Sequence, residues 1–275
     1  MLECVVNISE GRDRSTVDAL ASAAGSTLLD LHVDSSHHRS VLTIAGDEVE
    51  DAARKVARVA IERIDLTRHE GVHPRLGAVD VVPFVPLGEN GLRQDGDLSE
   101  AVRARDAFCA WAAKALGLPC FVYGPERSLP EVRRHAFSSL APACGPLLPH
   151  PTAGACCVGA RPVLVAYNLV LSEASIELGH KAVEAIRSPE VRALAFRVGE
   201  GVQVSCNLVA PWRVGPSHVY ERVASIASIK DAELVGLIPE IVLHAIDRER
   251  WDALGLSEGR TIESRLAGRR SAQDG

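Results

Sequence analysis

The order in which strand-like and helix-like segments follow one another constrains this fold more than any single motif. The clearest helix is predicted from Asp47 to about Asp65, where apolar residues recur at helical spacing. In chain order, the first half is predicted to contain a strand at 3–9, a helix at 15–25, strands at 26–33 and 39–46, the helix just named, a strand at 79–87, a helix at 97–116 and a strand at 120–124. This order is β-α-β-β-α-β with an additional helix, and its middle strands form a hairpin.

The second half is predicted to repeat this order. Its segments are a strand at 162–171, a helix at 172–188, hairpin strands at 194–198 and 202–209, a helix at 216–227, a strand at 232–238 and a helix from 239. Because hairpins and crossover helices are mixed, we expect an α+β fold of two ferredoxin-like α/β sandwich subdomains rather than a purely parallel sheet.

The subdomains are predicted at 1–159 and 160–258, followed by a charged tail at 259–275 that is frayed or partly disordered. Within the first subdomain, the segment 125–159 is rich in proline and glycine. These residues disfavour regular helices and strands, so the segment is predicted to be an excursion or linker.

Composition limits the classes of function. With 47% hydrophobic and 24% charged residues, the 275-residue chain has the make-up of a folded globular protein. A formal net charge of -6 argues against a general partner role for nucleic acid or an anionic membrane, and no apolar run is long enough to span a membrane. Seven scattered cysteines without a CxxC pair predict a reducing, cytoplasmic location. The chain lacks GxGxxG and GxxxxGK[ST], so these nucleotide sites have no support.

The stretch RHEGVHPRLGAVD, residues 68–80, carries the strongest catalytic candidate. His73 precedes Pro74, which restricts its backbone to extended conformations just before the strand predicted at 79–87. An imidazole both accepts and donates a proton near neutral pH, so His73 is a candidate general acid and base. The alternative from spacing alone is a structural or solvent-exposed loop histidine.

A metal site is the second reading of the histidines. The candidate ligands are His32, His37, His38, His69 and His73. The H-x3-H spacing pairs two ligands mainly on a helix, whereas Gly71 and Pro74 predict a loop here, so the sequence predicts no metal. Cys156 and Cys157 are read as small apolar residues approaching a strand, because adjacent cysteines rarely satisfy disulfide geometry.

A series of motifs along the chain indicates a protein family, which the spacing of the histidines alone does not. In chain order these are ECVVNISEGRD, DSSHHRSVLTIAG, HEGVHPRLGAVDVVPFVPL, GARPVLVAYN, VQVSCNL and VGLIPE. The series resembles the formiminotransferase family, including the formiminotransferase part of formiminotransferase-cyclodeaminase, over about residues 1–245. The resemblance implies transfer of the formimino group of N-formimino-L-glutamate to N5 of tetrahydrofolate, without a metal or a nucleotide. It also implies a homodimer.

The resemblance further implies site residues. The catalytic histidine of the family falls on His73, and the folate-binding segment falls on 145–154, whose matching positions are Gly145, Pro146, Pro149 and Gly154. Both reactants carry carboxylates, for which Arg39 and Arg75 are the candidate cations. Asn7, with Ser9 and Glu10, is a candidate to line the same cleft.

Three alternatives to formimino transfer stay open at this point. The segment LLPHPTAG matches the family only at its proline and glycine positions, which leaves the role of His150 unexplained. A non-catalytic folate-binding module would fit this divergence. Formyl transfer from N-formylglutamate would use the same histidine on a similar scaffold. Metal-dependent hydrolysis that uses the histidine cluster is the third alternative.

Overall fold

The computed structural model describes residues 1–71, 75–88 and 97–273, and the backbone alone for 270–273. Two compact units divide these residues, one formed by 1–71, 75–88 and 97–162 and the other by 163–273. The subdomain boundaries expected above stay predictions. Within the described ranges, none of the helices combines the length and the apolar composition needed to cross a bilayer.

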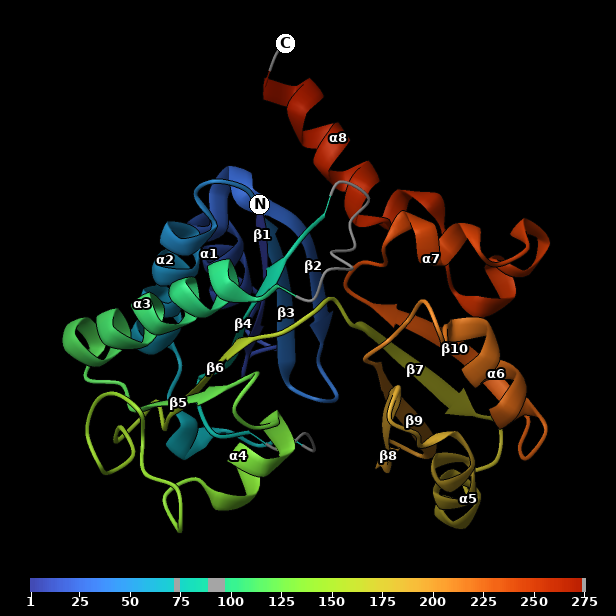
Figure 1. The fold of residues 1–275 in the computed structure, drawn as a ribbon. Coiled ribbons are helices and arrows are strands. Elements are labelled where there is room, and N and C mark those ends of the chain that lie inside the picture. Colours follow the sequence, from blue (N-terminus) through green and yellow to red (C-terminus); the bar gives the residue numbers. More distant parts are fainter. Residues whose placement is uncertain (72–74, 89–96, 274–275) are drawn as a thin grey trace. The chain divides into compact units, whose positions relative to one another are not determined.

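The N-terminal unit contains every strand and helix predicted for it, with two additions (Figure 1). Its elements are β1 (Leu2–Ile8), α1 (Arg14–Ala24), β2 (Leu28–Asp34), β3 (Arg39–Ala45), α2 (Val49–Arg63), β4 (Val79–Pro86), α3 (Ser99–Leu116), β5 (Cys120–Tyr123), α4 (Leu129–His135) and β6 (Cys156–Ala160). Local chemistry sets several ends. The Asp13 side chain caps the first turn of α1, and Gly117, in the left-handed conformation, ends α3.

These strands form one six-stranded sheet in the order β2-β3-β1-β4-β6-β5. The first four strands pair antiparallel in the ferredoxin-like arrangement, which confirms the predicted fold class. Parallel pairing of β6 with β4 and with β5 extends this sheet beyond the ferredoxin-like core. Side chains of β1 alternate, so Cys4, Val6 and Ile8 enter the core shared with α1, α2 and α3 while Asn7 lies on the opposite face.

The prediction of an excursion or linker at 125–159 is wrong for α4 and β6, although residues 136–155 between them form no helix or strand. Its end forms β6, a central strand that is fully buried, and α4 packs its Val132 against Val81, Phe121 and Cys157. The strand escaped detection because CCVGA is short and made of small residues beside a proline-rich stretch. Between two parallel neighbours such a strand is stabilised by backbone pairing on both sides, which local composition does not reveal.

The C-terminal unit repeats the β-α-β-β-α-β order. Its elements are β7 (Val165–Leu171), α5 (Ile176–Ile186), β8 (Val191–Val198), β9 (Gly201–Leu208), α6 (Pro216–Ala224), β10 (Ile229–Val235), α7 (Glu240–His244) and α8 (Ile262–Gln273). The sheet order is β10-β7-β9-β8 with antiparallel pairing throughout. This is the same ferredoxin-like arrangement as in the first four strands of the N-terminal unit.

The expectation of a frayed tail after 258 is wrong for residues 262–273, which form α8. The start of α8 is fixed by backbone bonds, since Ile238 N–H donates to Arg260 and Ile262 N–H donates to Ile238, at 3.1 and 3.0 Å. Thr261 and Ile262 are each 1% exposed. The segment 262–273 is therefore a helix with a fixed start, although its charged composition predicted a frayed tail.

Candidate active site

The loops at one edge of the six-stranded sheet gather most of the predicted site residues. Strand β1 ends at Ile8 where β3 begins at Arg39 and β4 begins at Val79, because β1 is antiparallel to both. Strand β6 runs parallel to β4 and begins at the same edge. We call this the loop edge: it comprises the segments 9–13, 35–38, 68–78 and 150–155 as far as they are described, and the strand residues beside them.

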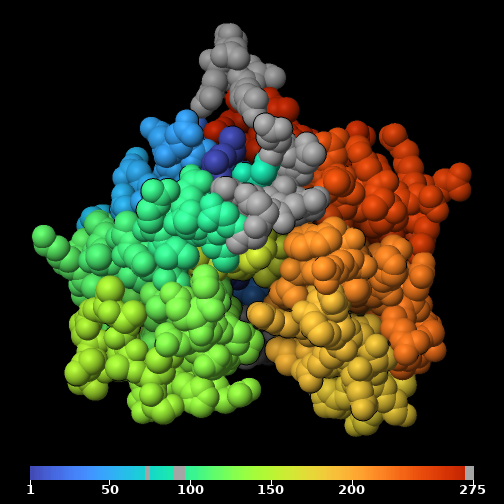
Figure 2. Space-filling model, in the orientation of Figure 1, coloured from blue at the N-terminus to red at the C-terminus, as the bar shows by residue number. Residues whose placement is uncertain are grey.

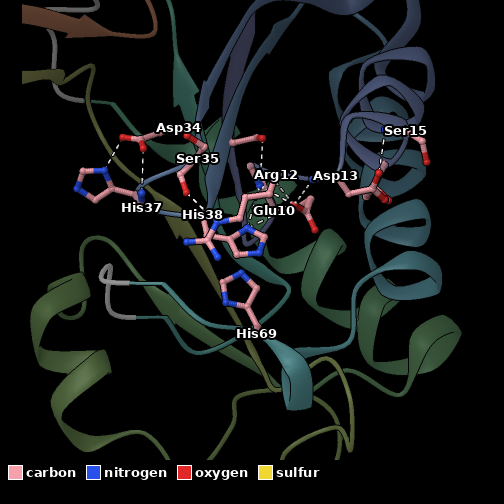
Figure 3. A network of polar contacts seen from close by, with 12 residues as sticks. Glu10, Arg12, Asp13, Ser15, Asp34, Ser35, His37, His38 and His69 are labelled. Carbon is pink, nitrogen blue, oxygen red and sulfur yellow. Dashed lines mark hydrogen bonds and ion pairs between the residues drawn. The ribbon is translucent and has the colours of Figure 1, made fainter. Parts of the chain in front are cut away.

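A tight turn after β1 is organised by Glu10. Its Oε1 accepts hydrogen bonds from the backbone N–H groups of Gly11, Arg12 and Asp13 at 2.8, 2.7 and 2.9 Å (Figure 3). The turn lies against the β2–β3 connection, since a Cβ on Gly11 would be 2.3 Å from the Asp34 carbonyl oxygen. Glycine is therefore required at position 11 for this approach.

Two histidines stack beside this turn. The rings of His38 and His69 are 3.9 Å apart at 27°, and Nδ1 of His38 accepts from Gly11 N–H at 3.1 Å and lies 3.3 Å from Glu10 Oε1 (Figure 3). Burial lowers the pKa of His38, opposed by Glu10. Burial, and then Arg75 and His38, lower the pKa of His69 to about 4. Both imidazoles are therefore neutral at pH 7.

Arg75 ties the loop 68–77 to the β2–β3 connection. Its guanidinium donates to the carbonyl oxygens of His37 and His38 at 3.1 and 3.4 Å, and Nη1 lies 2.8 and 2.7 Å from the two ring nitrogens of His69. Gly71 leaves room for this group, because a Cβ there would be 2.5 Å from Arg75 Nη2. The described parts of the loop are thus held at the loop edge from both sides of residues 72–74.

The buried carboxylate of Asp80, at the start of β4, interacts with several positively charged side chains. Asp80 accepts from Leu76 N–H at 2.7 Å and from Arg133 Nη2 at 2.5 Å. Burial lowers the pKa of Arg39, and the positive charges of Arg133 and Arg75 lower it further. The negative charge of Asp80 raises the pKa of Arg39 and so opposes this shift. Asp80, which is 2% exposed, therefore forms an ion pair with Arg133 and interacts electrostatically with Arg39 and Arg75.

The predicted residues divide as follows. His73 lies outside the described residues. Asn7 pairs with Val41, which places its side chain on the face that also carries Arg39, and its amide donates to the Val5 carbonyl oxygen at 2.9 Å. Arg39 and Arg75 both lie at the loop edge. Arg133 reaches the loop edge through Asp80 but was not among the predicted residues, because it belongs to the segment interpreted as an excursion or linker.

The segment 145–154 runs between two points of the same edge. Gly154 packs on the loop 68–77, since a Cβ there would be 2.2 Å from the Leu76 carbonyl oxygen, and Gly145 packs on Leu118, just before β5. Between them, Pro146 and Pro149 are exposed, as are Leu147 and Leu148 at 72% and 76%. Figure 2 shows this yellow-green stretch on the surface of the N-terminal unit.

His150 has a structural explanation that the motif comparison lacked. Its Nδ1 accepts from the N–H groups of Thr152 and Ala153 at 3.3 and 3.1 Å, and its backbone pairs with Gly154. The imidazole therefore closes the turn at 150–154 that carries Gly154 to the loop edge.

Three of the candidate metal ligands, His37, His38 and His69, have other contacts in the described part of the chain. His37 bonds to Asp34, pointing away from the stacked pair of His38 and His69 (Figure 3). Among residues 1–71, 75–88 and 97–273, no three His, Cys, Asp or Glu side chains come together as metal ligands would.

Comparisons with known proteins agree over most of the chain. The sequence profile for the formiminotransferase domain, N-terminal subdomain, matches residues 1–161. A glutamate formimidoyltransferase of Streptococcus pyogenes serotype M1 is 34% identical over 272 aligned positions, which cover 87% of this chain and 89% of that protein. One of Thermoplasma acidophilum is 34% identical over 301 positions, 97% of each chain. The formimidoyltransferase-cyclodeaminase of Sus scrofa is 33% identical over 278 positions, 87% of this chain and 50% of that protein.

Proposed function

Because this chain belongs to the formiminotransferase family, we propose that it is a glutamate formimidoyltransferase. It moves the formimino group of N-formimino-L-glutamate to N5 of tetrahydrofolate, which is a co-substrate, and both reactants are small molecules. The observation that carries the proposal is the near full-length similarity to relatives of that name together with a histidine loop whose described ends, His69 and Arg75, are fixed at the loop edge.

His73 is the proposed proton carrier. Attack of folate N5 on the amidine carbon forms a C–N bond and a tetrahedral intermediate, and the proton lost from N5 passes to the imidazole. The C–N bond to glutamate then breaks as the imidazole returns this proton to the departing amine nitrogen. One group that accepts and then donates meets both needs. The stacked pair His38 and His69 is less suited to this role, because its pKa values are lowered.

Binding of two anionic reactants needs fixed cations. Arg39 and Arg75 are the proposed partners of substrate carboxylates, and Asn7 is a proposed polar contact beside them. The proposed folate segment comprises Gly145, Pro146, Pro149 and Gly154, and the packing of Gly154 on the loop 68–77 supports this assignment. Seven free cysteines, of which only Cys144 is not buried, support a reducing compartment such as the cytoplasm.

The test is an assay of glutamate release and folate mass on incubating the protein with N-formimino-L-glutamate and tetrahydrofolate. The native protein is expected to form 5-formiminotetrahydrofolate, and His73→Ala to lose about 10²- to 10⁴-fold in kcat. His135→Ala, on α4, is the control for a histidine outside the loop.

Other outcomes would redirect the proposal. Turnover of N-formyl-L-glutamate but not the formimino donor would replace it with formyl transfer. Folate binding without any turnover would replace it with a binding module. Full activity in folded His73→Ala would remove the proposed role of that residue.

A further inference from the structure

We propose that Arg133 binds a carboxylate of the glutamyl moiety of a reactant, and that Asp80 orients its guanidinium for this task. This inference rests on the proposed function and adds a specificity-determining residue to it. The ligand chemistry is an amino dicarboxylate, supplied either by the formimino donor or by the glutamate tail of the folate.

The fold delivers Arg133 to the loop edge through α4. Val132 is fully buried against Val81 and Cys157, on the sheet face opposite α1, α2 and α3, and this anchors the helix. The next residue, Arg133, reaches Asp80 across a sequence separation of 53 residues. Its side chain is 21% exposed whereas that of Asp80 is 3% exposed, so Arg133 is the more accessible member of this ion pair.

The charges around Asp80 favour an added anion. The negative charge of Asp80 favours the charged forms of Arg39, Arg75 and Arg133, and Asp34 acts in addition on Arg39. The positive charges of Arg133 and Arg75 each disfavour the charged form of Arg39. A ligand carboxylate would relieve this repulsion among like charges.

Arginine can serve two carboxylates together. Its planar guanidinium carries several N–H donors in a fixed fork, so contact of Nη2 with Asp80 fixes the orientation of the whole group. Asp80 is itself fixed by Leu76 N–H. Asp80 is therefore a positioning residue, and Arg133 is the group expected to touch the reactant.

The experiment compares full-length Arg133→Gln and Arg133→Lys with Arg134→Gln, which removes the same charge from an exposed neighbour on α4. We measure kcat and KM for each reactant, and glutamate binding by calorimetry. Arg133→Gln is expected to raise one KM and weaken binding of the matching reactant by about 10- to 100-fold, while kcat changes less than about threefold. Arg133→Lys should recover part of this loss, and Arg134→Gln should behave as the native protein.

The arms of the experiment separate the possible results. A rise in the donor KM with weaker glutamate binding identifies the donor carboxylate, and a rise in the folate KM alone identifies the folate tail. The double variant Asp80→Asn/Arg133→Gln should raise that KM by less than the product of the two single-variant changes, as expected if part of the effect of Asp80 acts through Arg133.

Unchanged KM values and unchanged glutamate binding in Arg133→Gln would overturn the inference, as would a loss of kcat and folding stability at constant KM. If the native protein shows no turnover, the proposed function fails instead. Calorimetry with glutamate and tetrahydrofolate on the native and Arg133→Gln proteins then still decides whether Arg133 binds a carboxylate.

Discussion

At the scale of single residues, glycines set how closely the loops of the edge approach one another. Gly11 packs against backbone atoms, with Asp34 O, Arg39 N and Arg39 O at 2.3, 2.7 and 2.9 Å from a Cβ placed there. Backbone atoms cannot swing aside as a side chain can. The turn that presents Glu10 to His38 therefore depends on the absence of a side chain at position 11.

Gly11→Ala is expected to lower the free energy of unfolding by about 1–3 kcal/mol, because the added methyl group overpacks the contact between the turn and β3. Urea denaturation measures this change. The control is Gly259→Ala, where no atom lies within 4 Å of the added Cβ. Equal stability of the two variants would show that the turn does not hold this close packing.

The stacked histidines make stability depend on pH. The pKa of His69 is about 4 in the folded protein and near 6.5 when unperturbed, so the unfolded chain binds more protons between these values. Stability is therefore expected to fall as pH falls from about 6.5 to 4. Because His69 is partly exposed and screened by solvent, the loss should be about 1 kcal/mol or less.

Urea midpoints at pH 7 and pH 5 test this expectation. His69→Gln should show a smaller difference between the two pH values than the native protein, while His38, whose pKa is also lowered, keeps part of it. His180→Gln, on α5 in the C-terminal unit, is the matched control. An unchanged pH dependence in His69→Gln would contradict the assignment of this effect to the stacked pair.

At the scale of elements, α8 illustrates how a polar sequence is held by a few buried residues. Ile262 is 1% exposed at its first position, and its N–H donates to Ile238, so the segment 260–262 is bonded to the stretch between β10 and α7. The anchoring contacts precede the helix body. The charged residues that follow therefore do not prevent the helix from starting at a fixed place.

Ile262→Ala is expected to destabilise the protein by about 2–4 kcal/mol, through lost burial and the cavity that remains. The matched control is Ile241→Ala on α7, because Ile241 is 45% exposed and should lose little. Chemical denaturation followed by circular dichroism compares the two. A cost for Ile262→Ala no larger than for Ile241→Ala would contradict the anchoring role.

At the scale of the whole molecule, both units share the ferredoxin-like strand arrangement but differ in what is added. The N-terminal unit extends its sheet with β6 and β5. Helix α4 packs on the face of this sheet opposite to the one covered by α1, α2 and α3. The C-terminal unit keeps a four-stranded sheet. The described candidate residues Asn7, Arg39, Arg75, Arg133 and Gly154 all belong to the extended unit.

We also predict that the chain forms a homodimer, as the family resemblance implies. Sedimentation velocity should give a mass twice the 29.4 kDa of one chain at micromolar concentration. A stable interface of about 800 Å² from each partner would keep the dimer intact on dilution. A single species of 29.4 kDa at every concentration would refute this prediction.

The sequence alone determined the order of most elements. The period of apolar residues in α2 and the turn residues between β2 and β3 act over a few positions, so their local pattern predicts local structure. The ordered motifs likewise indicated the family before any geometry was known. The same patterns failed for β6 and α8, because backbone pairing and a few buried contacts outweigh composition there.

Only the tertiary structure decided which side chains meet. Arg133 and Asp80 are 53 residues apart, and Arg75 reaches the carbonyl oxygens of His37 and His38 across 38 and 37 residues. The stacking of His38 on His69 depends on the same approach of two loops. Such contacts follow from strand order and register, which set the ends of distant strands side by side, and no periodicity within the chain encodes them.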